Sequence, residues 1–535
     1  MSDVKERKIR ILITVVSVLL LSFSVIRLLF QIINITAVSV DNNISNEIRD
    51  YVSFRLTRYI LDGVNPYQVD FLNVPKVPFV FSYPGLNALI VAVVCRVTGM
   101  SIIAGNYTVN IITVLLTTVI LCLLTKDVIK GSKVTGFISI AVNTATFFSL
   151  FGVPFFNQHT DSLGILFFSF IMLCVYKNPK KTLIPSILTV FLIFTKQIMA
   201  VMALPLFVYY LILDRKSGLR YFLQCAVTGI LTVAVVQLLF PLFWTQTIYT
   251  IFAINDDYGD YIWSLINILS FYGRYVMYLL ASVLSVCCLL YIRKKDDPGF
   301  SVFKRIKAFI KKADYELYLV LNLVFGTLFL IYFAKCGIDG FKYCQDMLAP
   351  SLFVLSVFLW NGRLGSSVKD NELTRALIAS MLCLMSFVTL FFFDDDIYHK
   401  EDVENYTRLE TLIGEYADQD IFLGTNATGY LLNEDIWDGD NIWFDDGQIG
   451  FINGDMISNK LFDAVFYGEE VWNAGNSYAL EVNTKVRNGE FALIITSFDE
   501  IIDDQILEQN YYIYDVIGLK TDQHDIVDVT IWLRR

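Results

Sequence analysis

The chain has 535 residues, of which 55% are hydrophobic and 15% aromatic, and its mean hydropathy is strongly positive. This composition excludes an ordinary soluble globular protein and favours a polytopic membrane protein. The formal net charge is -10, but about 31 acidic against 8 basic residues follow Phe393, so the preceding part is basic. Nucleic acid is not expected as a partner, because an acidic tail repels phosphates, and a solvated domain surface explains most of the acidity.

Apolar runs recur up to Phe393 and then stop. A helix needs about 20 apolar residues to cross a hydrocarbon core of about 30 Å. The predicted spans are residues 10–31, 104–125, 134–152, 162–176, 182–194, 197–213, 219–243, 263–292, 315–335, 347–361 and 373–393. Residues 1–393 are therefore predicted to form a polytopic α-helical domain with about 11 transmembrane helices, embedded in the lipid bilayer.

Clusters of Lys and Arg indicate which loops face the cytoplasm. The basic segments include "KERKIR", "KDVIKGSK", "KNPKK" and "DRKSGLR", whereas "DDYGDY" and the stretch after 393 are acidic. A multi-pass protein of the cell membrane follows, with a cytoplasmic N-terminus and an extracytoplasmic C-terminal part. Residues 84–99 then have no room to cross and are predicted to form an interfacial or re-entrant helix. The alternative is that they cross and a later short window does not.

Residues 32–103 are thus predicted to form one large external loop. Within it, "NEIRDYVSFRLTRYIL" (46–61) has apolar residues at helical spacing with Arg49, Arg55 and Arg58 between them, as in a helix on a membrane surface. Gly63 is predicted to end this helix. The prolines that follow favour a turn and an extended chain. A rigid, aromatic-rich loop at the membrane surface could cover the binding site of a lipid-linked ligand.

Residues 394–535 are predicted to be a soluble extracytoplasmic α/β domain. β-rich runs alternate with polar, helix-compatible stretches, which favours a sheet covered by helices. The predicted strands lie in residues 420–425, 464–468, 491–497, 511–518 and 529–535. No catalytic motif is evident there, so no independent catalysis is expected.

Three motifs occur in order along the chain. After the first span come acidic residues, then "ILDGVNPY" (60–67) and an extended stretch ending in "YPG" (83–85). This pattern resembles the first external loop of the GT-C superfamily of integral-membrane glycosyltransferases, in particular the polyprenol-phosphate-mannose-dependent type, except that Gly85 stands where that type has a second proline. "FTKQIMAVMALPLFVYYLI" (194–212) resembles the family's Lys-containing outer hairpin, and "FKYCQDMLAPSLF" (341–353) its basic-Tyr motif.

The resemblance implies an inverting hexosyltransferase, mannosyltransferase-like, acting in the cell envelope. Its donor would be a polyprenyl-phosphate-linked sugar and its acceptor an extracytoplasmic glycolipid, cell-wall polymer or protein. Such a transfer needs a base for the acceptor hydroxyl and groups that hold the departing phosphate. The competing class is a transporter or flippase of lipid-linked sugars, although no internal repeat is evident. A structural protein or receptor of the envelope is a third class.

The candidate general bases are the loop carboxylates Asp50 and Asp41. Asp50 lies thirteen residues before Gly63, about where the resemblance places the family's catalytic acid, whereas Asp41 lies nearer the end of the first span. Asp41 and Asn42 are also good N-cap residues, so either carboxylate has a structural alternative as a helix cap. Both candidates stay open at this point.

The candidate substrate-binding residues come from several segments. A polar cluster lies where an external turn enters a span, and basic residues lie at or below the outer face, where a charge should have a partner or a ligand. The candidates are Asn157, His159, Asp161, Lys196, Arg274, Lys342, Tyr343, Tyr67 and Tyr83. Each basic residue has a structural alternative as a member of an ion pair, for example Lys342 with Asp339 or Asp346.

No metal site is predicted from the residue spacing. The three histidines, at 159, 399 and 524, are too scattered for a usual zinc site. The acidic run at 393–396 could attract a divalent cation, but a solvated hinge explains it as well. The working expectation is no cofactor, with a divalent cation left open.

Overall fold

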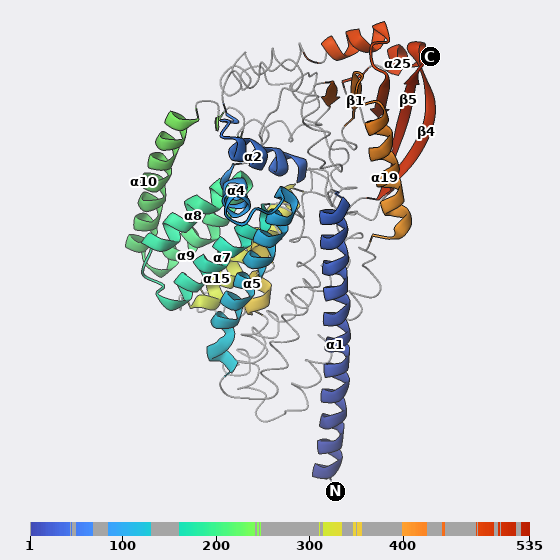
Figure 1. Cartoon of the computed structure of the whole chain (residues 1–535). Helices are drawn as coiled ribbons and strands as arrows, with labels where there is room; N and C mark the ends of the chain where they lie inside the picture. The colour runs from blue at the N-terminus through green and yellow to red at the C-terminus, as the bar shows by residue number, and fades with distance from the viewer. Residues whose placement is uncertain are drawn as a thin grey trace.

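The structure is a computed structural model of the whole chain. It describes residues 2–42, 44, 50–67, 84–129, 160–240, 243–244, 247, 310, 314–333, 346–348, 350–355, 398–424, 441–444, 478, 480–496, 501–502, 504–520 and 526–535. Apolar helices make up the first part of the chain, and a mixed sheet with helices lies near the C-terminus (Figure 1). The protein is therefore a helical membrane protein that also carries a sheet.

The first helix, α1, is longer than the span expected at residues 10–31. It runs unbroken over Ser2–Asn42, which at about 1.5 Å per residue is about 60 Å, twice the thickness of a hydrocarbon core. Its upper part lies beside α19 (Lys400–Glu415), as Figure 1 shows. Residues 32–42, beyond the predicted span, are mainly β-branched and have low helix propensity. The contact with α19 therefore helps to explain why they stay helical.

Among the described residues, four helices contain stretches long and apolar enough to cross a membrane: Val25–Asn42, Ile102–Thr125, Arg215–Leu239 and Tyr315–Tyr332. They belong to α1, α5 (Ile102–Ile129), α10 (Arg215–Leu239) and α15 (Tyr315–Phe333). Shorter apolar helices pack between them, namely α7 (Asp161–Lys177), α8 (Leu183–Thr195) and α9 (Ala203–Leu213), with the 3-10 helix η3 (Gln197–Met202) between α8 and α9. The windows 182–194 and 197–213 correspond to α8 and to η3 with α9; this segment is called the hairpin below, but α8 and α9 each pack on α10 rather than tightly on each other.

Polar side chains connect neighbouring helices of this bundle. Ser162 Oγ of α7 donates to Asn110 Oδ1 of α5 at 2.7 Å. The hydroxyls of Thr189 on α8 and Tyr221 on α10 lie 2.9 Å apart. Within an apolar bundle such pairs satisfy groups that lipid cannot hydrogen-bond, so they stabilise the helix arrangement modestly.

The first loop contains two short helices that lie across the direction of α1 in Figure 1. α2 spans Asp50–Asp62 and α4 spans Leu86–Thr98. α4 has 13 residues, about 20 Å, too short to cross a hydrocarbon core. α2 ends at Gly63, whose φ is 74°, as the sequence predicted. Arg96 Nη1 of α4 donates to the Leu61 carbonyl at 3.2 Å, which joins the two helices.

The C-terminal unit, defined here as the described residues from 398 to 535, is built on a five-stranded sheet of order β2-β1-β3-β5-β4. The strands are β1 (Ile421–Leu423), β2 (Ile442–Phe444), β3 (Leu493–Thr496), β4 (Tyr511–Lys520) and β5 (Ile526–Arg534). β2, β1 and β3 are parallel, with Ile421 opposite both Ile442 and Leu493, whereas β5 runs antiparallel to β3 and β4.

Helices cover the two faces of this sheet. Tyr406, Leu409 and Ile413 of α19 pack with the sheet residues of one face. Val482 and Val486, from the helical residues 480–488, and Leu507 of α25 (Asp504–Asn510) pack against the other face. β1, β3, β4 and β5 each overlap a predicted strand run, whereas β2 was not predicted and the run 464–468 lies outside the described residues.

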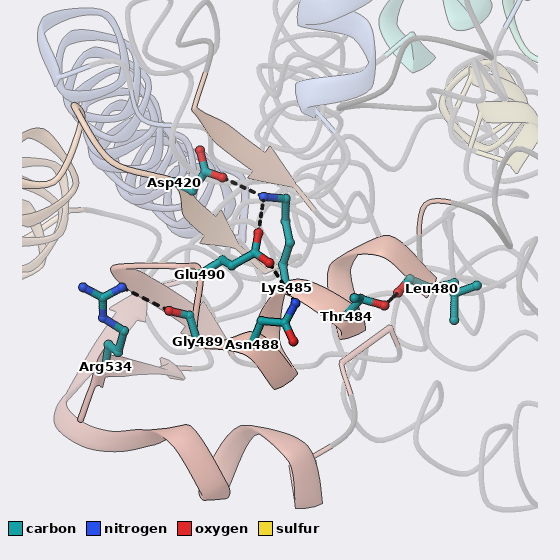
Figure 2. Close-up of polar contacts among 8 residues, drawn as sticks. All are labelled: Asp420, Leu480, Thr484, Lys485, Asn488, Gly489, Glu490 and Arg534. Carbon is teal, nitrogen blue, oxygen red and sulfur yellow. Dashed lines mark hydrogen bonds and ion pairs between the residues drawn. The ribbon is translucent and has the colours of Figure 1, made fainter.

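A polar cluster around Lys485 closes the amino end of β1 (Figure 2). Lys485 Nζ lies 2.9 Å from both Asp420 Oδ2 and Glu490 Oε2, and it sits over the Trp443 ring at 5.1 Å. Ligands of parallel sheets bind at the carboxyl ends of the strands, and this cluster lies at the opposite end. We therefore assign it to stability.

The Lys485 cluster predicts a pH dependence of stability. The hydrogen bond from Lys485, and to a smaller extent the one from Asn488, lowers the pKa of the Glu490 carboxyl. Ionised Glu490 thus stabilises the folded state above the unfolded pKa of about 4.3, and this stabilisation is lost as the pH falls through the lower folded pKa. Thermal melting at acid pH should show that Glu490→Gln loses less stability between about pH 5 and pH 3 than wild type does. The exposed Glu508→Gln is the control; an unchanged acid loss in Glu490→Gln contradicts the prediction.

Candidate functional site

Two residues selected from the sequence, Asp161 and Lys196, form a buried ion pair. Lys196 Nζ donates to Asp161 Oδ1 at 2.7 Å, and the two side chains are 4% and 8% exposed. Asp161 is the first residue of α7, where a negative charge is favoured by the helix dipole. Lys196 is the extended residue between α8 and η3. Residues 35 positions apart are thus joined at the ends of adjacent helices.

A third charged group, Asp346, completes the cluster. It is 1% exposed, lies at the start of the apolar stretch 346–355, and interacts electrostatically with both Asp161 and Lys196. Two adjacent carboxylates repel each other, whereas the ammonium attracts both. The cluster of Asp161, Lys196 and Asp346, called the charged cluster below, therefore combines one ammonium with two acidic groups in a site without solvent.

A glycine allows the two halves of this cluster to approach. Gly164 lies one turn after Asp161 on α7, and a Cβ at this position would overlap the thioether end of Met199 in η3. Met199 follows Lys196 by three residues and is fully buried. The absence of a side chain at Gly164 thus brings η3 close enough to α7 for Lys196 to reach Asp161.

The "NPY" motif connects the first loop to the hairpin that carries Lys196. Asn65 Oδ1 accepts from the Tyr67 amide at 3.0 Å, and its Nδ2 donates to the Leu239 carbonyl at the end of α10 at 3.2 Å. The Tyr67 ring packs edge-on against Phe243 at 4.9 Å, and Phe243 stacks on Phe194 at 5.9 Å. Tyr67 is therefore held two rings away from the chain segment of Lys196.

Tyr67 is also the point where the two loop motifs meet. It is 4% exposed, and burial raises the pKa of its phenol well above the usual value. A Cβ on Gly85 would lie 3.5 Å from the Tyr67 hydroxyl. The "GVNPY" segment and Gly85, which lies 18 residues after Tyr67 in the sequence, therefore come together around this neutral phenol.

The two candidate bases lie on different helices. Asp41 is exposed in the last turn of α1, and Asp50 is the first residue of α2. Asp41 and Asn42 therefore do not cap the loop helix: they end α1 because that helix continues past the apolar run. The Asn42 side chain instead donates to the Val38 carbonyl at 2.9 Å.

One further expectation for the loop is wrong. Arg55 was expected among the surface arginines of a helix that lies on the membrane, but it is only 6% exposed and its guanidinium lies over the Phe444 ring at 5.1 Å. The C-terminal unit provides this contact, which the local sequence of α2 does not reveal. Arg58 does stay at the surface and pairs with Asp62 at 3.0 Å.

Several sequence candidates lie outside the described residues: Tyr83, Asn157, His159, Arg274, Lys342 and Tyr343. Asp346 was considered only as a partner of Lys342, and sequence reasoning missed its place beside Asp161. The available signal was a carboxylate at the start of an apolar run, where a buried charge requires a partner. Within the described ranges, no three His, Cys, Asp or Glu residues form a group that could hold a metal ion.

Comparisons with known proteins identify the fold. No family profile and no curated protein sequence matches the chain. Among solved structures, ArnT from Cupriavidus metallidurans is similar in its apo state, with a TM-score of 0.52 and 9% identity over 96% of this chain and 97% of that one. ArnT bound to undecaprenyl phosphate has a TM-score of 0.51 and 10% identity, over 96% of this chain and 97% of that one. An Archaeoglobus fulgidus oligosaccharyltransferase has a TM-score of 0.50 and 10% identity, over 95% of this chain and 73% of its own.

These structures are GT-C glycosyltransferases, and the chain has the fold of that superfamily, as its motifs suggested. The likeness extends over nearly the whole chain, so it includes both the helical part and the C-terminal unit. At this level of identity it establishes the fold, and the activity has to be argued from the site.

Proposed function

We propose that the protein is an integral-membrane glycosyltransferase that takes a sugar from a polyprenyl-phosphate-linked donor. The observation that carries the proposal is the GT-C fold together with the charged cluster, because Lys196 follows Phe194, which Phe243 connects to Tyr67 of the loop motif. The ArnT structure with undecaprenyl phosphate supports a lipid phosphate as the donor's carrier. A hexose, such as mannose, is the proposed sugar.

The proposed reaction is one displacement with inversion. Asp50, or Asp41 in its place, accepts the proton of the acceptor hydroxyl as that oxygen bonds to the anomeric carbon. The bond between this carbon and the phosphate oxygen breaks, and its electron pair leaves with the polyprenyl phosphate. Basic groups stabilise that developing negative charge. We assign this role to Arg274, Lys342 and Tyr343, and we assign sugar binding to His159 and Asn157.

The charged cluster has a different part in this proposal. Lys196 already donates to Asp161, so a direct contact with phosphate would require it to exchange partners. Its closeness to η3 and to the aromatic contacts of Tyr67 supports a role in holding the hairpin below the loop. The membrane-tethered donor would enter from the lipid and the acceptor from the extracytoplasmic side, with the C-terminal unit on that side.

The test is turnover by the purified full-length protein with a panel of polyprenyl-phosphate sugars and a mixture of envelope glycolipids, polymers and peptides. The expected result is release of polyprenyl phosphate with sugar transfer for one donor. Arms with a chelator and with Mg²⁺ or Mn²⁺ measure the dependence on a divalent cation. Movement of labelled donor across liposome membranes without cleavage would instead identify a flippase and overturn the proposal.

A further inference from the structure

The loop that carries both candidate bases is fixed to the C-terminal unit at a point between them. Ile44 follows Asp41 by three residues and precedes Asp50 by six. Its side chain is 0% exposed and belongs to the hydrophobic cluster formed by α19 and one face of the sheet. The Ile44 amide donates to the Ser39 carbonyl at 3.2 Å, so the chain turns directly after α1.

The segments on both sides of Ile44 contact the same unit. Before it, Asn34 of α1 makes two hydrogen bonds with the backbone of Tyr398, accepting from its amide at 2.7 Å and donating to its carbonyl at 3.3 Å. Val38 packs against the same cluster as Ile44. After it, Arg55 of α2 lies over Phe444, the last residue of β2. Contacts at residues 34, 38, 44 and 55 therefore flank Asp41 and Asp50 from both sides.

These contacts differ from those of an ordinary interdomain surface. A surface between two parts of a chain is usually partly polar and wet, whereas Ile44 shares the dry interior of the unit with Leu409, Ile421 and Phe444. A displacement of the unit therefore moves the loop at that residue. Because a shift of about 1 Å at a catalytic group can cost about 100-fold in rate, the position of the unit determines whether the base can act.

We propose that the C-terminal unit is a positioning element for the general base and that Ile44 is the residue through which it acts. The inference rests on the proposed function, since it needs a loop carboxylate as the base. Ile44 is a positioning residue: its side chain lies in the interior of the unit, and it acts by holding the loop that carries Asp41 and Asp50.

The experiment compares Ile44→Ala, Ile44→Val and Leu409→Ala in the full-length protein. Leu409 is 0% exposed in the same cluster but lies on α19, so its truncation weakens the same interior without freeing the loop. We expect Ile44→Ala to lower kcat on the order of 10-fold to 100-fold with an unchanged KM for the donor, and Ile44→Val to restore near-normal turnover. An equal loss in Leu409→Ala, or an unchanged kcat in Ile44→Ala, overturns the proposal.

A second measurement does not depend on activity. Hydrogen exchange of the amides of residues 43–50 should be faster in Ile44→Ala than in wild type and Leu409→Ala. If wild type transfers no sugar from any polyprenyl-phosphate donor, the proposed function fails, whereas the exchange result still tests whether Ile44 holds the loop. Equal exchange in all three proteins shows that it does not.

Discussion

Replacing Lys196 by methionine is expected to abolish sugar transfer and to destabilise the folded protein by about 3–5 kcal/mol. The reason is that Lys196 is the cation of a buried cluster with two acidic side chains, Asp161 and Asp346. Removing it leaves these groups without the ammonium in a site that water does not reach, and a buried charge that loses its partner is costly. Thermal unfolding in detergent and turnover measure the two effects.

Asp161→Asn should cost less than Lys196→Met, because Lys196 can still face Asp346. The double variant Lys196→Met/Asp161→Asn should lose less unfolding free energy than the sum of the losses in the two single variants, because it removes both charges of the pair. Lys180→Met, an exposed lysine, is the matched control. A stable and fully active Lys196→Met protein would show that the cluster is dispensable.

The sequence was most informative where local chemistry determines the structure. Gly63 ends α2 in a left-handed conformation that the residue type suggested. α8, and η3 with α9, coincide with the two short apolar windows predicted on either side of Lys196. β4 and β5 follow from runs of aromatic and β-branched residues. In each case the signal lies within a few residues of the feature it predicts.

Features that depend on distant contacts were not predicted. The length of α1 depends on partners such as Tyr398, which lies 364 residues away from Asn34. The burial of Arg55 depends on Phe444, at the end of a strand with only three residues. Likewise, Asp161, Lys196 and Asp346 were all visible as charges near apolar runs, but only the tertiary packing shows that they meet. Sequence periodicity does not contain these pairings.

Asp50→Asn is expected to lower kcat on the order of 100-fold to 10,000-fold while donor binding is kept, the range typical of a lost general base. Asp50 is the first residue of α2, and Ser53 to Thr57 of that helix are buried, whereas Asp41 is exposed at the end of α1. A carboxylate on the same helix as buried residues is the better candidate for a base that has to meet an acceptor hydroxyl away from bulk water. Single-turnover rates and binding of the radiolabelled donor measure the two effects separately.

Two further variants decide between the carboxylates and exclude a general effect of charge. Asp41→Asn should keep most of the turnover, and Asp62→Asn, at the exposed opposite end of α2, should resemble wild type. If Asp41→Asn shows the large loss and Asp50→Asn does not, the base lies at the end of α1. Full activity in both variants would remove the base from this loop altogether.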